Sequence, residues 1–530
     1  MKRAALLLGT ISLATGAGAQ QLPADQAAMK AHVAYLASDA LRGREAGTPD
    51  YDKAAAYVAD QMRAAGLAPA GDAGGWFQKV PLFVSKATAE PVVSLGGAPL
   101  VFGTDYTLRG TAPAAKVDIA APVVFAGYGV IDAASGRDDY RGLDVRGKIV
   151  AVLYSGPKGL NSEVAAHLGS RIDRARIAAA HGAVGMVYLW TTQLASVLPF
   201  DRAARNWDDR GVTWANPDGT PRDPGAPSLA VLSFTGAAKL FADSAIDWEA
   251  VKAADTAGRT VPTGPLAVTL KASEHFDISH ADSSNVVGRL PGSDPKRAAQ
   301  VVVLSAHLDH IGITRPVNGD TINNGAMDNA IGVASLLEAA KLFKASGKAP
   351  ARSVLFLAVT AEEKGLIGSD YYATHPTVPK DDIVANVNLD MPILTYRFTD
   401  LVAFGADRSS IGRTVAQVAA AEHLALTPDP DPDQADFVRT DHYSFVRQGV
   451  PSISLTPVPA GPGKAATEDF LEHHYHQPSD DMTLPFDWAA GREFVKINYQ
   501  IARTLADAPD RPRWVKGDYF GTAFKGPMAK

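Results

Sequence analysis

The sequence predicts an α/β protein with a mixed, mostly parallel sheet sandwiched by helices and an inserted strand-rich domain. From about Asn285 onward, apolar segments typical of strands alternate with amphipathic segments typical of helices. Continuous apolar strands separated by helices indicate a parallel sheet that is covered on both faces. Before that region, short apolar runs lie between glycines, as expected of a strand-rich module with tight turns.

The first helix is predicted in the segment YDKAAAYVADQMRAAGL (51–67), where apolar residues recur at helical spacing. Gly66 is a plausible end of this helix, because glycine commonly follows the last helical turn. The residues expected on its buried face are Ala54, Ala55, Val58, Met62 and Ala65.

The strand-rich region comes next, at roughly 111–267, with Gly-rich turns and long polar loops. Its strands are expected in APVVFAGYGV (121–130), GKIVAVLYSG (147–156) and AVGMVYLW (183–190), with a helix in SRIDRARIAAAHGA (170–183).

The parallel sheet is predicted from the apolar runs of the second half. These are VVVLS (301–305), SVLFLAVT (353–360), IVANVNL (383–389) and PSISL (451–455), with a helix in AIGVASLLEAAKLF (330–343).

Composition narrows the possible functions. The chain has 530 residues, of which 46% are hydrophobic, and a formal net charge of −6. This balance gives no basic face for nucleic acid and enough apolar material for more than one core. The sequence has no cysteine, which excludes disulfides, zinc fingers and thiol nucleophiles. A metal site would therefore have to use His, Asp and Glu.

The N-terminus has the order of a secretory signal. Lys2 and Arg3 precede an apolar run from Ala4 to about Leu13, and small residues follow up to Ala19. We expect a signal peptide over residues 1–19 and a periplasmic or secreted product; the alternative is an uncleaved anchor. No later apolar run reaches membrane length, so no stable membrane span is expected in the mature chain.

Polar side chains follow the predicted parallel strands at the point where each strand ends. In a parallel sheet, ligands gather outside the carboxyl ends of the strands, so these side chains should meet at one edge. One further carboxylate stands immediately before the helix at 330–343. The residues at these positions are His307, Asp309, Glu362, Glu363, Asp390 and Asp328.

Several carboxylates gathered in one cleft repel each other, and a divalent cation would resolve that repulsion. Imidazole and carboxylate without sulfur suit zinc, with manganese or cobalt as substitutes. The number of carboxylates indicates two metals that share one bridging carboxylate. A second imidazole should come from EDFLEHHYHQPSDDM, where spacing alone does not choose among His473, His474 and His476.

At these residues the chain resembles the co-catalytic dizinc aminopeptidases, the group that also holds glutamate carboxypeptidase and the inactive transferrin receptor. The matching segments, in the family's order, are HLDHIG, NNGAMDNAIGVASLLE, TAEEKGLIGS, NLDM and YHQPSDD. The resemblance implies a zinc exopeptidase fold built from residues 20–110 and 268–530. Residues 111–267 resemble the protease-associated domain that many members carry as an insert.

The resemblance also implies roles for individual residues. One zinc would be held by His307 and Asp390, the other by Glu363 and His476, and Asp328 would bridge both. His476 is favoured over its neighbours because the family's last ligand follows a tyrosine, here Tyr475. The general base would be Glu362, and Tyr475 would donate to the oxyanion.

Three further implications concern the surroundings of the metals. Asp309 would hydrogen-bond His307 and fix its tautomer. The peptide bond after Asp328 is a candidate cis bond. The possible substrate-pocket residues are Arg439, Asp441 and His442.

The expected function is that of a metallo-exopeptidase acting on peptides, specifically an aminopeptidase with two zinc ions. A carboxypeptidase or dipeptidase on the same scaffold is the close alternative. A non-catalytic receptor-like protein and a glutaminyl cyclase, which uses one zinc, are the remaining alternatives. The sequence leaves side-chain preference and oligomeric state open.

Overall fold

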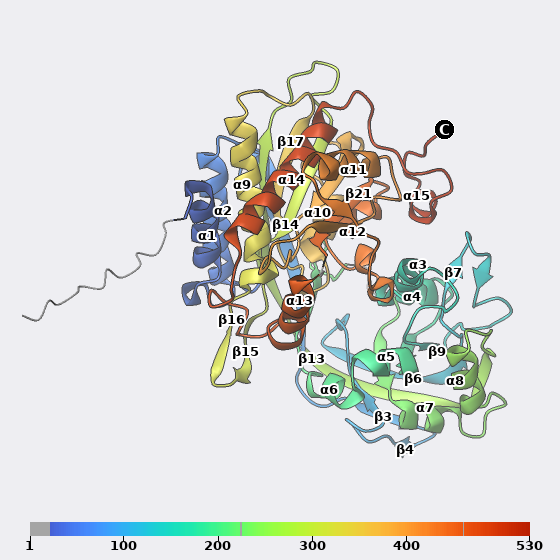
Figure 1. Cartoon of the computed structure of the whole chain (residues 1–530). Coiled ribbons are helices and arrows are strands. Elements are labelled where there is room, and N and C mark those ends of the chain that lie inside the picture. The colour runs from blue at the N-terminus through green and yellow to red at the C-terminus, as the bar shows by residue number, and fades with distance from the viewer. Residues whose placement is uncertain (1–21, 223–224, 459–460) are drawn as a thin grey trace, which may run out of the picture.

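A computed structural model describes residues 22–222, 225–458 and 461–530. The predicted signal peptide, residues 1–19, lies outside the described residues. Figure 1 shows two sheets, a larger one flanked by helices and a smaller strand-rich one, joined by the long strand β13 (Gly264–Leu290). None of the helices in the described part of the chain has the length and apolar character needed to span a bilayer.

The larger sheet has a parallel centre, as the sequence predicts. β17 (Ser353–Val359), β14 (Val301–His307), β18 (Ile383–Asn388) and β21 (Ser452–Pro457) lie side by side in that order and run parallel. β13 closes one side antiparallel to β17, and β19 (Asp400–Phe404) closes the other antiparallel to β21. Every residue of β14, β17 and β18 is buried, which explains why their sequences are mostly apolar.

Helices cover both faces of this sheet, which confirms the predicted sandwich. α1 (Ala24–Leu36), α2 (Pro49–Ala64), α9 (Ile331–Ala345) and α14 (Trp488–Asp507) share one apolar core on one face. α10 (Ile367–Thr374) and α12 (His442–Val446) pack against the other face. α11 (Ile411–Ala421) joins the first core.

The face predicted for the helix at 51–67 is confirmed. Ala54, Ala55, Val58, Met62 and Ala65 are all buried. The helix ends before Gly66, whose φ of 79° is a left-handed conformation that glycine adopts without strain.

The smaller sheet is built around the first part of β13. Its order is β4 (Ala98–Pro99), β3 (Val92–Leu95), β13, β6 (Lys116–Phe125), β9 (Ile149–Leu153), β10 (Gly185–Leu189), β12 (Ser228–Leu232) and β5 (Tyr106–Thr107). Its helices include α3 (Ser162–Leu168), α4 (Arg171–Ala180), α7 (Phe234–Phe241) and α8 (Trp248–Thr256). The sheet reaches beyond 111–267 at both ends, because β3 before it and β13 after it are hydrogen-bonded into it. The protease-associated identity of this domain stays a prediction.

The remaining elements complete the two domains. They are β1 (Ala68–Pro69), β2 (Phe77–Ala87), β7 (Ile131–Asp132), β8 (Arg137–Asp138), β11 (Gly211–Trp214), β15 (Gly312–Val317), β16 (Asp320–Asn323), β20 (Ala425–Leu426), α5 (Thr192–Val197), α6 (Phe200–Arg205), α13 (Pro462–His473), α15 (Tyr519–Ala523) and the short helical turns η1 (Asp39–Leu41), η2 (Asp72–Gly74), η3 (Ala326–Ala330), η4 (Lys380–Asp382), η5 (Pro432–Gln434) and η6 (Asp436–Val438).

The two domains contact each other next to α12. Arg447 donates two hydrogen bonds, at 2.7 and 2.9 Å, to the two carboxylate oxygens of Asp173 in α4. The hydroxyl of Tyr443 lies 2.6 Å from Nδ1 of His167 in α3. The smaller domain therefore rests against the helix that follows the candidate pocket residue Arg439.

Candidate metal centre

The predicted site residues converge at the carboxyl edge of the parallel sheet. His307 is the last residue of β14, Glu363 follows β17, and Asp390 follows β18. Asp328 lies in η3, directly before α9, and His476 lies just after α13. Strands adjacent in the sheet and two helix ends therefore bring imidazoles and carboxylates from distant parts of the chain together.

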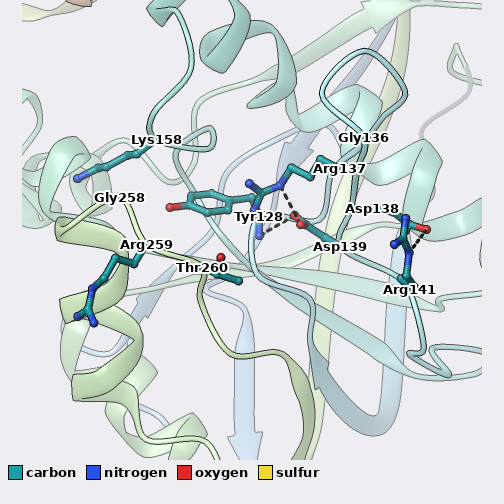
Figure 2. A pocket seen from close by; sticks show the side chains of 10 residues that line it. All are labelled: Tyr128, Gly136, Arg137, Asp138, Asp139, Arg141, Lys158, Gly258, Arg259 and Thr260. Atoms are coloured by element: carbon teal, nitrogen blue, oxygen red, sulfur yellow. Dashed lines mark hydrogen bonds and ion pairs between the residues drawn. The ribbon is translucent and has the colours of Figure 1, made fainter.

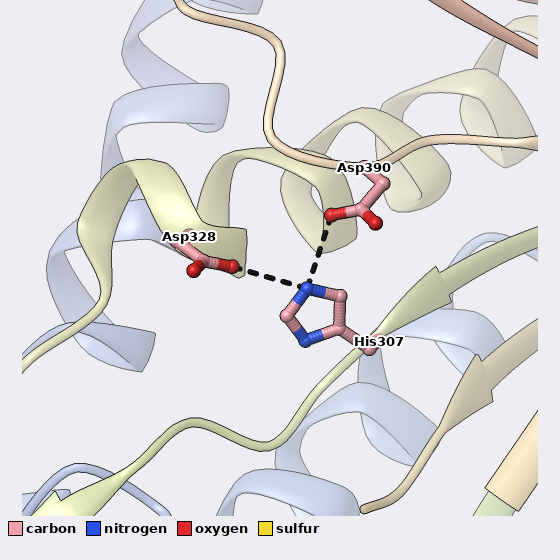
Figure 3. A group of neighbouring side chains, drawn as sticks. All are labelled: His307, Asp328 and Asp390. Atoms are coloured by element: carbon pink, nitrogen blue, oxygen red, sulfur yellow. Dashed lines mark hydrogen bonds and ion pairs between the residues drawn. The ribbon is translucent and has the colours of Figure 1, made fainter. Parts of the chain in front are cut away.

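The first cluster is formed by His307, Asp328 and Asp390 (Figure 3). Nε2 of His307 lies 3.1 Å from Oδ1 of Asp328 and 3.1 Å from Oδ1 of Asp390. Figure 3 shows both carboxylates directed at the same ring nitrogen. The imidazole is 1% exposed, so water does not separate these groups.

The second cluster uses the other oxygen of Asp328. Nε2 of His476 lies 3.3 Å from Oδ2 of Asp328 and 3.2 Å from Oε2 of Glu363. Asp328 thus presents one oxygen to His307 and the other to His476, which is the arrangement expected of a bridging carboxylate. The neighbours His473 and His474 contact Asp469 instead and take no part in the cluster.

The spacing of these atoms fits zinc. Two atoms bound to one tetrahedral zinc at about 2.0–2.1 Å lie about 3.3 Å apart. The four imidazole–carboxylate separations in the two clusters, between 3.1 and 3.3 Å, are close to this value. The donor set, nitrogen and oxygen without sulfur, also suits zinc. The residues present therefore fit a pair of zinc ions.

His310 is a member of this constellation that sequence reasoning missed. It is buried, and its Nδ1 lies 2.7 Å from Oε1 of Glu363, so it also groups with Asp328 and Glu363. That separation is a hydrogen-bond length and is shorter than the edge of a zinc tetrahedron, so we assign the second cluster to His476. The sequence feature that could have identified His310 is its place as the second histidine of HLDHIG, three residues after His307.

The charges of the two clusters stabilise each other. Burial by itself lowers the pKa of His476, but its contacts with Asp328 and Glu363 outweigh burial and raise that pKa to about 10. Burial raises the pKa of Asp328, yet hydrogen bonds with His307 and His476 hold it well below its ordinary value. The carboxylates therefore depend on nearby positive charge, which is what divalent cations supply.

Glu362 differs from the ligand-type carboxylates around it. Burial raises the pKa of Glu362 most. The charge of His307 lowers it and the like charges of Asp390 and Glu363 raise it, so that the pKa stands well above the ordinary value. Its carboxylate accepts no hydrogen bond from any other residue that the structure describes. It precedes Glu363 and follows Ala361, whose φ of 53° is left-handed, so the backbone is strained where it turns Glu362 into the site.

Asp309 makes the predicted hydrogen bond with His307, but through its backbone and not through its side chain. Nδ1 of His307 donates to the backbone carbonyl of Asp309 at 3.2 Å, so the carbonyl fixes the tautomer and the carboxylate does not. The two carboxylate oxygens accept instead from the backbone N–H groups of Glu362 and Glu363, at 3.0 and 3.3 Å. The physical reason is the turn after β14, which points the side chain at the end of β17. Asp309 thus holds the adjacent glutamates in place.

Two further buried residues hold the segment that carries Asp328. Asp480, in the motif YHQPSDD, accepts hydrogen bonds from the backbone N–H groups of Met327 and Asp328 at 2.7 and 3.0 Å. The guanidinium of Arg44 donates to the carbonyls of Leu308 and Gly325, each at 2.7 Å. Neither was assigned a role from the sequence, because their partners are backbone atoms far along the chain. The peptide bond after Asp328 is cis, as expected.

The candidate pocket residues do not behave alike. Arg439 is exposed and donates to the side chain of Gln434 at 3.2 Å. Asp441 and His442 are both 0% exposed, so they do not face an open pocket. Burial raises the pKa of Asp441 to about 7 and lowers the pKa of His442 to about 3. Of the three, only Arg439 is exposed to solvent.

A separate cavity of about 340 Å³ lies in the smaller domain (Figure 2). Its arginines are paired in part: Nε of Arg137 lies 2.8 Å from Asp139, and Nε of Arg141 lies 3.8 Å from Asp138. The guanidinium of Arg137 also covers the ring of Tyr128, 4.8 Å from its centroid. The residues that line this cavity include no imidazole and no ligand-type cluster.

The geometry defines an α/β protein with a candidate imidazole–carboxylate metal centre at the carboxyl edge of its sheet. Residues 285–502 match the family model described as Peptidase family M28. Over this segment the chain is similar to peptidase family M28, which confirms the predicted resemblance to the zinc aminopeptidases.

Relatives are similar over part of their length. Leupeptin-inactivating enzyme 1 of Streptomyces exfoliatus is 28% identical over 249 residues, which is 45% of this chain and 52% of that protein. Carboxypeptidase Q of Bos taurus is 38% identical over 207 residues, 38% of each protein. The chain spans about half the length of the first of these relatives and less of the second.

A solved structure covers nearly the whole chain. The aminopeptidase from Aneurinibacillus sp. strain AM-1 aligns with 92% of this chain and 95% of its own, with a TM-score of 0.52 and 19% sequence identity. At this identity the likeness shows the fold alone.

Proposed function

We propose that this protein is a dizinc metallo-exopeptidase, specifically an aminopeptidase that removes N-terminal residues from peptides. The observation that carries the proposal is the position of Asp328, whose two oxygens lie 3.1 and 3.3 Å from His307 and His476. One carboxylate between two imidazoles is the arrangement that holds two cations side by side. The match of residues 285–502 to the model of peptidase family M28 supports the same conclusion.

One zinc would be held by His307 and Asp390 and the other by Glu363 and His476, with Asp328 shared. When bound, such a pair lowers the pKa of water towards neutrality and polarises the carbonyl of a peptide. The chain's own residues supply the proton transfers and the donor to the oxyanion.

Glu362 is the general base of the proposed reaction. Its carboxylate is unoccupied by hydrogen bonds with other described residues, and its raised pKa gives it an affinity for the proton of an attacking water. After the attack it returns that proton to the leaving amine. A general base of this kind contributes about 10²–10⁴-fold to the rate.

Tyr475 is the proposed donor to the oxyanion. Burial raises the pKa of Tyr475 most, and the negative charges of Asp328, Glu363 and Glu362 raise it further. The phenol therefore stays protonated. Its ring stacks on that of His476 with centroids 3.9 Å apart, which holds the hydroxyl next to the second cluster. A fixed donor at that place stabilises negative charge as it develops.

A carboxypeptidase or dipeptidase is the second candidate, and Arg439 is the observation that favours it. This guanidinium is exposed, and its positive charge lowers the pKa of Tyr475. A cation there would suit the carboxylate of a short peptide. One relative in the comparison is itself named a carboxypeptidase.

Export remains a proposal drawn from the N-terminal sequence. We propose that residues 1–19 direct the chain to the periplasm or outside the cell, where peptides are its substrates. The length of the secreted protein after expression with its own N-terminus would test this.

Leucyl and alanyl anilides, compared with dipeptides that have a free carboxylate, test the proposed specificity. An aminopeptidase cleaves the anilides at rates comparable with the dipeptides. A dipeptidase cleaves only the dipeptides, and Arg439→Ala would then raise their KM. Glu362→Gln should keep its zinc and lose most turnover with either substrate; an active, zinc-loaded variant would refute the role of Glu362.

A further inference from the structure

The imidazole of His310 touches the candidate metal centre but has no part in the proposed reaction. It lies in the loop after β14 and is 0% exposed, and its Nδ1 is 2.7 Å from Oε1 of Glu363. An ionised carboxylate oxygen only accepts hydrogen bonds, so Nδ1 carries the proton and donates it. Water does not reach the ring and cannot replace this donor.

The two oxygens of Glu363 have different partners. Oε1 accepts from His310, whereas Oε2 lies 3.2 Å from Nε2 of His476. The hydrogen bond turns Oε1 towards His310 and leaves Oε2 facing His476, where a cation between Glu363 and His476 would bind. The hydrogen bond therefore selects which oxygen of Glu363 serves as a ligand and stops the carboxylate from rotating.

The ring of His310 is itself held in place by the segment that leads to Asp328. Gly325 has a φ of 60°, and a Cβ atom at Gly325 would lie 2.6 Å from Cγ and Cδ2 of the ring. The backbone of Gly325 therefore packs directly on the imidazole, which only glycine allows. On another side the ring meets that of His476 edge-on, with centroids 6.0 Å apart.

We propose that His310 is a positioning residue for Glu363, which sets the affinity of the cation held by Glu363 and His476. The cation held by His307 and Asp390 should be unaffected, because His310 contacts neither of these residues. This inference rests on the proposed dizinc function. A direct ligand role for His310 does not fit, since 2.7 Å is shorter than the edge of about 3.3 Å of a zinc tetrahedron.

The matched variants are His310→Asn and His310→Leu, which have nearly the same shape. The asparagine amide nitrogen takes the place of Nδ1 and keeps a donor, whereas leucine has none. Each protein is stripped of metal and titrated with Zn²⁺ in competition with a chromophoric chelator, which gives the affinity of each equivalent. Circular dichroism of the metal-free proteins checks that the variants fold.

We expect wild type to bind two equivalents. His310→Leu should bind one equivalent of Zn²⁺ as tightly as wild type and the other about 10–100-fold more weakly. That is the usual effect of losing a group that orients a metal ligand. His310→Asn should stay within a few-fold of wild type for both. Should His310→Leu not fold, His310→Gln takes its place, because its longer amide does not reach the position of Nδ1 and should weaken the same equivalent.

Two results would overturn the inference. If His310→Asn is weakened as much as His310→Leu, the donor is not what matters. If neither variant changes either affinity, His310 has no influence on the cation. If wild type binds fewer than two equivalents of Zn²⁺, the proposed metal pair is wrong. The titration of wild type therefore tests the proposed function separately from the role of His310.

Discussion

Asp480 accepts a hydrogen bond at 3.0 Å from the backbone N–H of Asp328, the residue that faces both imidazoles. Its other oxygen accepts from the N–H of Met327 at 2.7 Å. Both bonds are buried, so this carboxylate fixes the backbone that aims Asp328 between His307 and His476.

Asp480→Asn should weaken zinc binding. The amide nitrogen of asparagine donates and cannot accept, so it would face the backbone N–H of Met327 or Asp328 without a hydrogen bond. The backbone at these residues would then shift and move the carboxylate of Asp328. We expect a loss of about 10–100-fold in zinc affinity, measured by chelator competition. The matched control is Asp481→Asn, since the carboxylate of Asp481 accepts hydrogen bonds from its near neighbour Thr483 and not from the segment that carries Asp328. Equal affinities of the two variants would show that Asp480 does not position Asp328.

Arg44→Lys should destabilise the fold even though the charge is kept. Arg44 is fully buried and donates to the carbonyls of Leu36, Leu308 and Gly325 at 3.0, 2.7 and 2.7 Å. A lysine ammonium cannot reach all of them, and each buried carbonyl left without a donor costs about 1–3 kcal/mol.

Urea unfolding measures this cost, and Arg42→Lys is the control. The side chain of Arg42 is 64% exposed and has one long ion pair, 3.8 Å from Asp50, so its replacement should change the free energy of unfolding by less than about 0.5 kcal/mol. A similar small effect for Arg44→Lys would mean that the guanidinium does not hold the segment before Asp328.

Glu274→Gln should stabilise the protein increasingly as the pH rises. Burial raises the pKa of Glu274 to about 8 from an ordinary value of 4.5. Between these values the folded state holds a proton that the unfolded state has lost, so the free energy of unfolding of wild type falls as the pH rises. The loss is complete above about pH 8 and amounts to a few kcal/mol, at most about 5.

The measurement is urea unfolding of wild type and Glu274→Gln at pH 5 and pH 9. The difference between the two proteins should be small at pH 5 and should favour the variant at pH 9. Glu90→Gln, at an exposed position on the same domain, should show no such trend. A pH-independent difference for Glu274→Gln would contradict the buried, proton-holding state of this residue.

Removal of zinc should lower the thermal stability. Asp328, Glu363 and Asp390 lie together at low exposure, and a cation that binds only the folded state stabilises it by mass action. Calorimetry with a chelator should give a lower Tm than calorimetry with added zinc, and the Tm should rise with free zinc concentration. Identical melting curves would show that the folded protein holds no zinc.

The sequence predicted the parallel sheet and the residues at its edge because both depend on local patterns. An uninterrupted apolar run ends at His307, and the ligands gather where such runs end. The bridging role of Asp328 followed from the family resemblance and stays a prediction; its two oxygens lie 3.1 and 3.3 Å from His307 and His476.

What sequence reasoning missed are contacts that no local pattern encodes. Arg44 reaches the carbonyl of Gly325, and Asp480 reaches the N–H of Asp328, in both cases from far along the chain. The side chain of Asp309 turns away from His307 towards Glu362 because of the loop geometry after β14. Similarly, the burial of Asp441 depends on how α12 packs, which the motif alone does not reveal.

Anomalous diffraction at the zinc edge, on crystals of the zinc-loaded protein, tests the central claim most directly. The account predicts two peaks, one among His307, Asp390 and Asp328 and one among Glu363, His476 and Asp328. A single peak, or two peaks that do not share Asp328, would contradict it.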